Sequence, residues 1–210
     1  MLNEHLTGSQ IAWKQLPKHN EAVEKAVMEL EIGGFETYDL TYHENIKIVK
    51  DFIKNDKTLK IITHRPDKIA VNDRCGFEYE VKKNFEYYKG DESHRTFIDL
   101  CTINACYGDF CVGAEIWFCW YNESLKISWS KFEWVINNVI SINIPPRWDS
   151  DLIHKSWYYS IAEKLFPEKH IYFNETRGSG DPMVIVNKKK LKCVSTSEMI
   201  TTFRQQGDQI

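Results

Sequence analysis

Hydrophobic positions in the first part of the chain alternate between helical spacing and short, dense runs. Residues 18–32 place Val23, Val27 and Leu30 on one helical face, which predicts an amphipathic helix that ends at the two glycines after it. The aromatic and β-branched run that follows predicts a strand over residues 35–42. A second helix over 44–55 and a second strand over 59–67 are predicted in the same way.

The middle of the chain contains its most apolar segment. Residues 92–106 are predicted to form a helix, and residues 113–122 a strand that is apolar on both faces. A strand of this kind is usually central in a sheet, with helices covering both sides. The pattern therefore predicts an α/β or α+β fold.

The last part of the chain is less regular. It predicts a strand at 125–129, a helix at 130–140, a break at Pro145-Pro146, strands at 170–175, 183–187 and 190–194, and a closing helix at 196–203. A helix from residue 149 or 150 carries an apolar stripe of Ile153, Trp157 and Ile161. We expect one domain over residues 1–210.

Composition narrows the class of protein only slightly. The net charge of −3 gives no global electrostatic case for or against nucleic acid. No apolar run reaches the roughly 18 residues that a membrane span needs, and no secretory signal is visible, so we expect a cytoplasmic protein without a membrane partner. The six cysteines form no Cys-x-x-Cys pair, which argues against a zinc ribbon or a thioredoxin-like site.

Residues 65–83, RPDKIAVNDRCGFEYEVKK, join two strand-like runs through a polar turn. Side chains alternate along a strand, so Glu78, Glu80 and Lys82 project from one face, opposite the apolar residues between them. A hairpin would also bring Asp67, at the far end of the first strand, close to Glu80. The alternative for the same letters is an exposed hairpin whose charges keep a sheet edge soluble.

This arrangement suits a magnesium site. Mg²⁺ prefers hard oxygen ligands and keeps several waters, so Asp67 and Glu80 are a sufficient protein contribution, with Mn²⁺ as a substitute. A metal held in this way polarises a phosphate and lowers the pKa of a bound water. Lys82 could orient that water or offset charge in the transition state.

Pro66-Asp67 followed by Glu80-Val81-Lys82 resembles the PD-(D/E)xK signature of the restriction-endonuclease-like nuclease superfamily. In that family a helix bearing a Glu precedes a hairpin that carries the signature, and a helix and a buried strand follow. The predicted elements over residues 18–122 have the same succession, except for the extra helix at 44–55. The resemblance implies a central mixed sheet flanked by helices, with residues 123–210 contacting the substrate or elaborating the core.

The resemblance also implies roles for individual residues. Asp67 and Glu80 would be metal ligands and Lys82 the catalytic lysine, while the helix Glu would be Glu24, with Glu21 as the other candidate. Glu78 is a further acidic candidate because it shares a strand face with the motif.

Basic residues outside the motif are candidates for contacts with nucleic acid. They are Arg65, beside the signature; Arg147 and Lys155, which lie among aromatic residues; Arg177, in a glycine-containing loop; and Lys188, Lys189 and Lys190, in the strongest basic cluster.

The resemblance implies a Mg²⁺-dependent endonuclease of the type II restriction kind, acting on DNA and working as a homodimer. Two alternatives stay open at this point. One is an RNA endonuclease, and the other is a non-catalytic protein of the same fold that binds nucleic acid or another partner.

Overall fold

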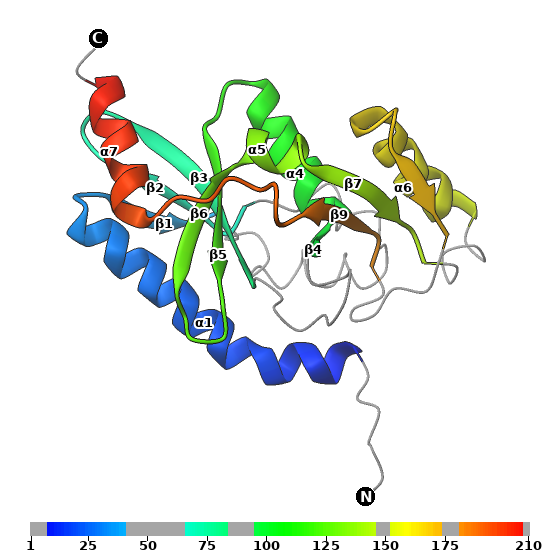
Figure 1. Cartoon of the computed structure of the whole chain (residues 1–210), viewed down its shortest axis with the longest axis horizontal. Coiled ribbons are helices and arrows are strands. Elements are labelled where there is room, and N and C mark those ends of the chain that lie inside the picture. The colour runs from blue at the N-terminus through cyan, green and yellow to red at the C-terminus, as the bar shows by residue number, and fades with distance from the viewer. Residues whose placement is uncertain (1–7, 41–65, 84–94, 146–151, 174–180, 208–210) are drawn as a thin grey trace, which may run out of the picture.

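The computed structural model describes residues 8–40, 66–83, 95–145, 152–173 and 181–207. Within these residues the chain is α+β and forms two sheets that lie side by side (Figure 1). The predicted helix at 44–55 and most of the predicted strand at 59–67 lie outside the described residues. Among the described helices, none combines the length and apolar character needed to cross a membrane.

The first sheet is mixed and has five strands in the order β1-β2-β3-β5-β6. The first three pair antiparallel, β5 lies parallel to β3, and β6 returns antiparallel to β5. The element order of helix, hairpin, helix and buried strand that the sequence predicted is therefore confirmed. The bounds are β1 Glu36–Asp39, β2 Lys68–Val71, β3 Gly76–Lys83, β5 Ile116–Tyr121 and β6 Ile127–Lys131.

The second sheet has the order β4-β9-β7-β8 and joins a strand from the middle of the chain to three from its last third. Its strands are β4 Arg95–Asp99, β7 Val139–Asn143, β8 His170–Tyr172 and β9 Met183–Asn187. The helices are α1 Gly8–Ile32, α4 Leu100–Cys111, α5 Phe132–Ile136, α6 Leu152–Leu165 and α7 Thr196–Gly207.

Strand β5 is buried on both faces and separates two hydrophobic clusters. Trp117, Cys119 and Tyr121 point into an α1-side cluster that α1, β3, β6 and α7 complete. Ile116, Phe118 and Trp120 point into an α4-side cluster that also takes in residues of β4, α4, β7, α6 and β9. The predicted central strand, apolar on both faces, is confirmed.

Helix α1 packs on the first sheet through small side chains. Ala22, Ala26 and Leu30 are fully buried, whereas Val23 is only half-buried, so the packed face shares Leu30 with the predicted one but is turned by roughly 70° toward the alanines. The helix starts at Gly8 and contains Pro17, so it is longer than predicted. It ends as expected: the Phe35 N–H donates to the Leu30 carbonyl across Gly34, whose φ is +86°.

Three other predictions of secondary structure are wrong. Residues 95–99 form a strand before α4, because Thr96 and Ile98 alternate inward between pairing partners on β9. Residues 139–143 form β7, so only a short helix remains of the one predicted at 130–140. The predicted strand at 190–194 is reduced to a single bridge between Val194 and Trp129.

The stripe predicted for α6 is also offset. Trp157 is 40% exposed, and the buried positions are Tyr158 and Ala162. The helical period is confirmed, but the face that meets the α4-side cluster lies one residue further along.

Candidate active site

The hairpin of β2 and β3 brings Asp67 near Glu80, as predicted. Lys68 pairs with Tyr79 and Val71 with Gly76, so Asp67 lies across from Glu80, one step beyond the paired strand. The turn between the strands is closed by the Asn72 side chain, whose Oδ1 accepts bonds from two backbone N–H groups of the turn. The hairpin that the sequence predicted is therefore formed.

Asp67, Glu80 and Lys82 meet at the end of this hairpin. The Asp67 N–H donates to Glu80 Oε2 at 3.0 Å, and the Val81 N–H donates to Asp67 Oδ2 at 2.8 Å. Lys82 Nζ lies 2.7 Å from Glu80 Oε1. The two carboxylates are thus linked through the backbone and one of them is paired with the lysine. The exposed hairpin considered as the alternative does not describe this end of β3, because Glu80 is only 2% exposed.

The position of Glu80 follows from the strand pairing. In the parallel register, Glu80 is beside Phe118 and Lys82 is beside Trp120, and both aromatic residues belong to the α4-side cluster. The charged face of β3 therefore lies under the α4-side cluster, while Phe77, Tyr79 and Val81 pack in the α1-side cluster. This division of faces is the one that the strand alternation predicted.

Burial determines the electrostatics of the pair. Burial, together with the nearby Asp67 carboxylate, raises the pKa of Glu80 to about 8, although the Lys82 ammonium acts against the shift. For Lys82, burial lowers the pKa, but the three carboxylates of Glu80, Asp99 and Asp67 together raise it above its ordinary value. Lys82 is therefore a cation among three carboxyl groups, and it only partly offsets the effect of burial on Glu80.

Asp99 is a member of the site that the sequence reasoning missed. Its Oδ2 lies 3.6 Å from Lys82 Nζ. It ends β4 and immediately precedes α4, whereas the sequence reasoning placed it inside a helix. An Asp directly before an apolar helical run is typical of a helix start, and that signal could have placed Asp99 before the helix and not inside it.

A histidine of α1, His19, lies within electrostatic range of the site. His19 lies on the face of α1 that packs on the sheet, and its Nδ1 is 3.5 Å from the Tyr121 hydroxyl. Burial lowers the pKa of His19, the Asp67 charge raises it and the Lys82 charge lowers it further, which places the ring within electrostatic range of both residues. Glu24 and Glu21 are exposed on other sides of α1, so the structure does not bring them to Asp67 and Glu80.

Glu78 shares the strand face of Glu80, as predicted, and is half-buried. It lies two residues nearer the start of β3, about 6.5 Å along the strand from Glu80, beside Ile116 of β5. It therefore flanks the carboxylate pair and is not part of the contacts that join Asp67, Glu80 and Lys82.

The candidate contacts to nucleic acid are placed only in part. Arg65, Arg147 and Arg177 lie outside the described residues, and Lys155 is on α6 with its side chain outside the description. Lys188, Lys189 and Lys190 form the turn after β9. Because β9 pairs antiparallel with β4, with Asn187 opposite Arg95, this turn lies at the end of the sheet away from Asp99, about 14 Å along the strand.

The donor set fits a hard divalent cation in its chemistry. Within the described part of the chain, no group of three or more His, Cys, Asp or Glu side chains is arranged to hold a metal ion. The two carboxylates of Asp67 and Glu80 supply oxygen ligands, and Mg²⁺ commonly uses one or two carboxylates with retained waters. These two residues are therefore the ones that would hold Mg²⁺.

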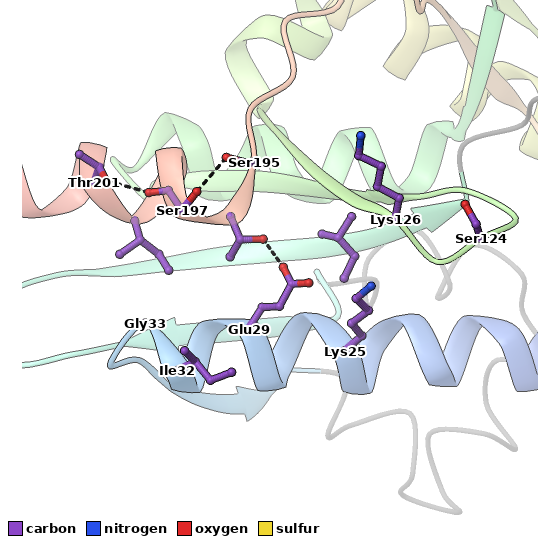
Figure 2. A pocket seen from close by; sticks show the side chains of 12 residues that line it. Lys25, Glu29, Ile32, Gly33, Ser124, Lys126, Ser195, Ser197 and Thr201 are labelled. Carbon is purple, nitrogen blue, oxygen red and sulfur yellow. Dashed lines mark hydrogen bonds between the residues drawn. The ribbon is translucent and has the colours of Figure 1, made fainter.

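A second polar feature is a cavity of about 670 Å³ between α1, the β5–β6 turn and the start of α7 (Figure 2). Lys25 and Lys126 line it, but Lys25 donates to the Leu125 carbonyl at 2.8 Å. Two of its lining residues, Glu29 and Thr196, belong to a hydrogen-bonded set in which Thr196 Oγ1 donates to Glu29 and accepts from Trp129 Nε1. These hydrogen bonds join α1, β6 and α7, which all contribute residues to the α1-side cluster.

The comparisons with known proteins give a limited result. No protein-family model matches the chain, and no curated protein matches it. Among solved structures, the chain is similar to Hjc, a Holliday junction resolvase from the archaeal hyperthermophile Archaeoglobus fulgidus, at 10% sequence identity and a TM-score of 0.45, covering 88% of this chain and 96% of that one. A likeness at this level assigns no family.

Proposed function

We propose that the protein is a Mg²⁺-dependent endonuclease that hydrolyses phosphodiester bonds in DNA. The observation that carries the proposal is the convergence of Asp67, Glu80 and Lys82, with the Lys82 ammonium 2.7 Å from a carboxylate that is almost fully buried. Two adjacent carboxylates and a lysine at the end of a mixed sheet are the parts that the sequence resemblance to the restriction-endonuclease-like superfamily requires.

Each residue has a defined part in this proposal. Asp67 and Glu80 would hold the cation, which when bound supplies polarisation of the scissile phosphate and a more acidic water. The bond from the Val81 N–H to Asp67 Oδ2 fixes one carboxylate, and the bond from the Asp67 N–H to Glu80 Oε2 fixes the other. Lys82 orients the attacking water or offsets the charge that develops on the phosphate.

The raised pKa of Glu80 supports a cation at this position. A buried carboxylate that keeps its proton up to a pH of about 8 is poorly compensated, and a divalent cation would replace that proton. Binding would then release a proton and tighten as pH rises. We propose Mg²⁺ as the physiological ion, with Mn²⁺ able to substitute.

The finer assignments rest on the sequence resemblance. It favours a restriction-type enzyme that acts on duplex DNA as a homodimer. The resemblance does not fix the form of the DNA, and Hjc is a Holliday junction resolvase, so the substrates to be tested include a four-way junction beside plasmid DNA.

The test compares two lysines in matched surroundings. Lys82 pairs with Glu80 and Lys131 with Glu115, both at 2.7 Å, and the two lysine side chains are 22% and 21% exposed. The purified protein and its Lys82→Ala and Lys131→Ala variants are incubated with plasmid, a four-way junction and a structured RNA, in Mg²⁺ or in EDTA. We expect cleavage of DNA in Mg²⁺ only, and a fall of about 10²- to 10⁴-fold for Lys82→Ala alone.

Each other result has a distinct meaning. Equal cleavage by the Lys82→Ala and Lys131→Ala variants would refute the assigned site. Cleavage of RNA alone would change the substrate class, and tight binding without cleavage would favour the non-catalytic alternative. Glu24→Gln is expected to leave cleavage unchanged, because Glu24 faces solvent on α1.

A further inference from the structure

The second sheet places the side chain of Asp99 at the candidate site. Asp99 is the last residue of β4, where it pairs with Met183 of β9. The next residue, Leu100, donates its N–H to the Pro182 carbonyl at 2.9 Å, so the junction between β4 and α4 is fixed to β9 on both sides of Asp99. The Asp99 backbone is therefore held by the second sheet and not by the hairpin that carries the other site residues.

The Asp99 carboxylate is not used to cap the helix that it precedes. It occupies the N-cap position of α4, where Asp is favoured because its oxygen can accept a bond from the first helical turn. No such side-chain bond is formed, and Oδ2 lies instead 3.6 Å from Lys82 Nζ. The Asp99 carboxylate therefore contacts Lys82 and not the first turn of α4.

Lys82 has two carboxyl partners of different kinds. Glu80 is nearly fully buried and lies 2.7 Å away, whereas the Asp99 side chain is 34% exposed and lies 3.6 Å away. A divalent cation on Glu80 would compete with the ammonium for the same carboxylate and would repel it at short range. Asp99, which takes no part in the Asp67 and Glu80 contacts, would then be the remaining anion beside the ammonium.

We propose that Asp99 is a positioning residue, which retains the Lys82 ammonium at the site when a divalent cation occupies Glu80. Glu80 and Asp99 are then alternative acceptors for the Lys82 ammonium. Glu80 accepts from it in the metal-free protein, and Asp99 accepts from it in the metal-bound protein. The catalytic consequence of this inference rests on the proposed function, whereas the contact between Asp99 and Lys82 does not.

Three variants test the proposal. Asp99→Asn keeps the shape and removes the charge, and Asp99→Glu keeps the charge on a longer side chain. Glu115→Gln is the matched control, because Glu115 has a 36% exposed side chain paired with Lys131 at 2.7 Å, and it precedes β5 at the end of the sheet away from Lys82. Circular dichroism and urea unfolding establish that each variant is folded.

The first readout does not depend on activity. Lysine ammonium protons give a proton–nitrogen NMR signal when an ion pair slows their exchange with water, and a Lys82→Arg sample assigns the signal. We expect the Lys82 signal to persist on addition of Mg²⁺ in the wild type, Asp99→Glu and Glu115→Gln, and to disappear on addition of Mg²⁺ in Asp99→Asn. Loss of the signal in Mg²⁺-loaded wild type, or its survival in Mg²⁺-loaded Asp99→Asn, would overturn the proposal.

The second readout is steady-state cleavage. Removing a side chain that orients an active group typically costs about 10- to 100-fold, so Asp99→Asn is expected to lower kcat by that factor with little change in KM. Asp99→Glu should recover most of the loss, and Glu115→Gln should show none. A rise in KM with unchanged kcat would place Asp99 in substrate binding and contradict positioning. If the wild type cleaves nothing, the proposed function fails while the NMR result still decides the Asp99 contact.

Discussion

The buried carboxylate of Glu80 should make the stability of the protein fall as pH rises, which is opposite to the usual effect of a carboxylate in an ion pair. Its pKa is raised from 4.5 to about 8, so the folded protein keeps a proton that the unfolded chain has already released in this interval. The stabilising effect of that proton is complete below pH 4.5 and is lost as pH rises through about 8.

One other described group acts in the lower half of this interval. The pKa of His19 is lowered from 6.5, so its contribution to stability has the opposite sign and grows with pH until about 6.5. Lys82, whose pKa is raised from 10.5, stays charged in both states below pH 8 and adds no slope there. The clearest window for Glu80 is therefore pH 6.5 to 8.

The magnitude follows from the linkage relation. One pKa unit corresponds to about 1.4 kcal/mol, so a group with a folded pKa near 8 lowers the free energy of unfolding by about 2 kcal/mol between pH 6.5 and pH 8. Glu80→Gln cannot titrate and should lose this fall. The assay is urea unfolding in EDTA, followed by the fluorescence of the buried tryptophans Trp117, Trp120 and Trp129.

The comparison of the wild type with Glu80→Gln is decisive because the two proteins share every other titratable group. The same fall in the wild type and in Glu80→Gln would show that the slope comes from other residues. A wild-type stability that rises over the window would show that Glu80 is ionised there and that the ion pair with Lys82 dominates. Addition of Mg²⁺ at pH 8 should stabilise the wild type and not Glu80→Gln, because only the wild type offers both carboxylates.

Two predictions concern the packing of α7. A Cβ on Gly33 would lie 2.2 Å from Ile200 Cδ1, so Gly33→Ala should lower the free energy of unfolding by about 1–3 kcal/mol. Ile200→Val removes that atom and should recover most of this loss in a double-mutant cycle. Additive effects of the two substitutions would contradict the clash. Thr196→Val should lower the free energy of unfolding by about 1–3 kcal/mol, because it leaves the buried Trp129 indole N–H without its acceptor at 2.9 Å. Thr201 is exposed, so Thr201→Val should change this free energy by no more than about 0.5 kcal/mol in the same urea assay. Equal effects of the two substitutions would refute the role of Thr196 as the acceptor for Trp129.

The hairpin and the buried strand could be predicted because their signals are local. Strand alternation in residues 76–83 assigns Glu80 and Lys82 to one face without knowledge of the partner strands. A run that is apolar on both faces similarly identifies β5 as central. The meeting of Asp67 with Glu80 then needed only the antiparallel register of two adjacent strands.

Asp99 could not be placed in the same way because its strand depends on distant partners. Residues 95–99 are few, and they become a strand by pairing with residues 183–187, which are far away in the sequence. Without that pairing, the apolar residues on both sides of Asp99 fit a helical period equally well. An error in one short element therefore concealed a site residue.

The face of α1 differs from the predicted one for a different physical reason. The valines gave the stronger hydrophobic signal, but the alanines allow the helix to approach the sheet closely, and Ala22 and Ala26 are the ones fully buried. His19 lies on the same face as the alanines and within electrostatic range of Asp67 and Lys82, whereas Glu24 is exposed. Size, and not only apolarity, decides which helical face packs on a sheet.

The double burial of β5 has a consequence for how the protein can be divided. Residues 18–122 form a tempting minimal fragment, but ending the chain there would remove Phe132 of α5, which stacks on Phe118 with ring centroids 6.4 Å apart, and the residues of α6, β7 and β9 that belong to the same α4-side cluster. The same strand supplies Trp117 and Tyr121 to the cluster closed by α7, near the other end of the chain. A shortened fragment would therefore lose contacts on both sides of its central strand at once, and it should aggregate even though it keeps every residue of the hairpin.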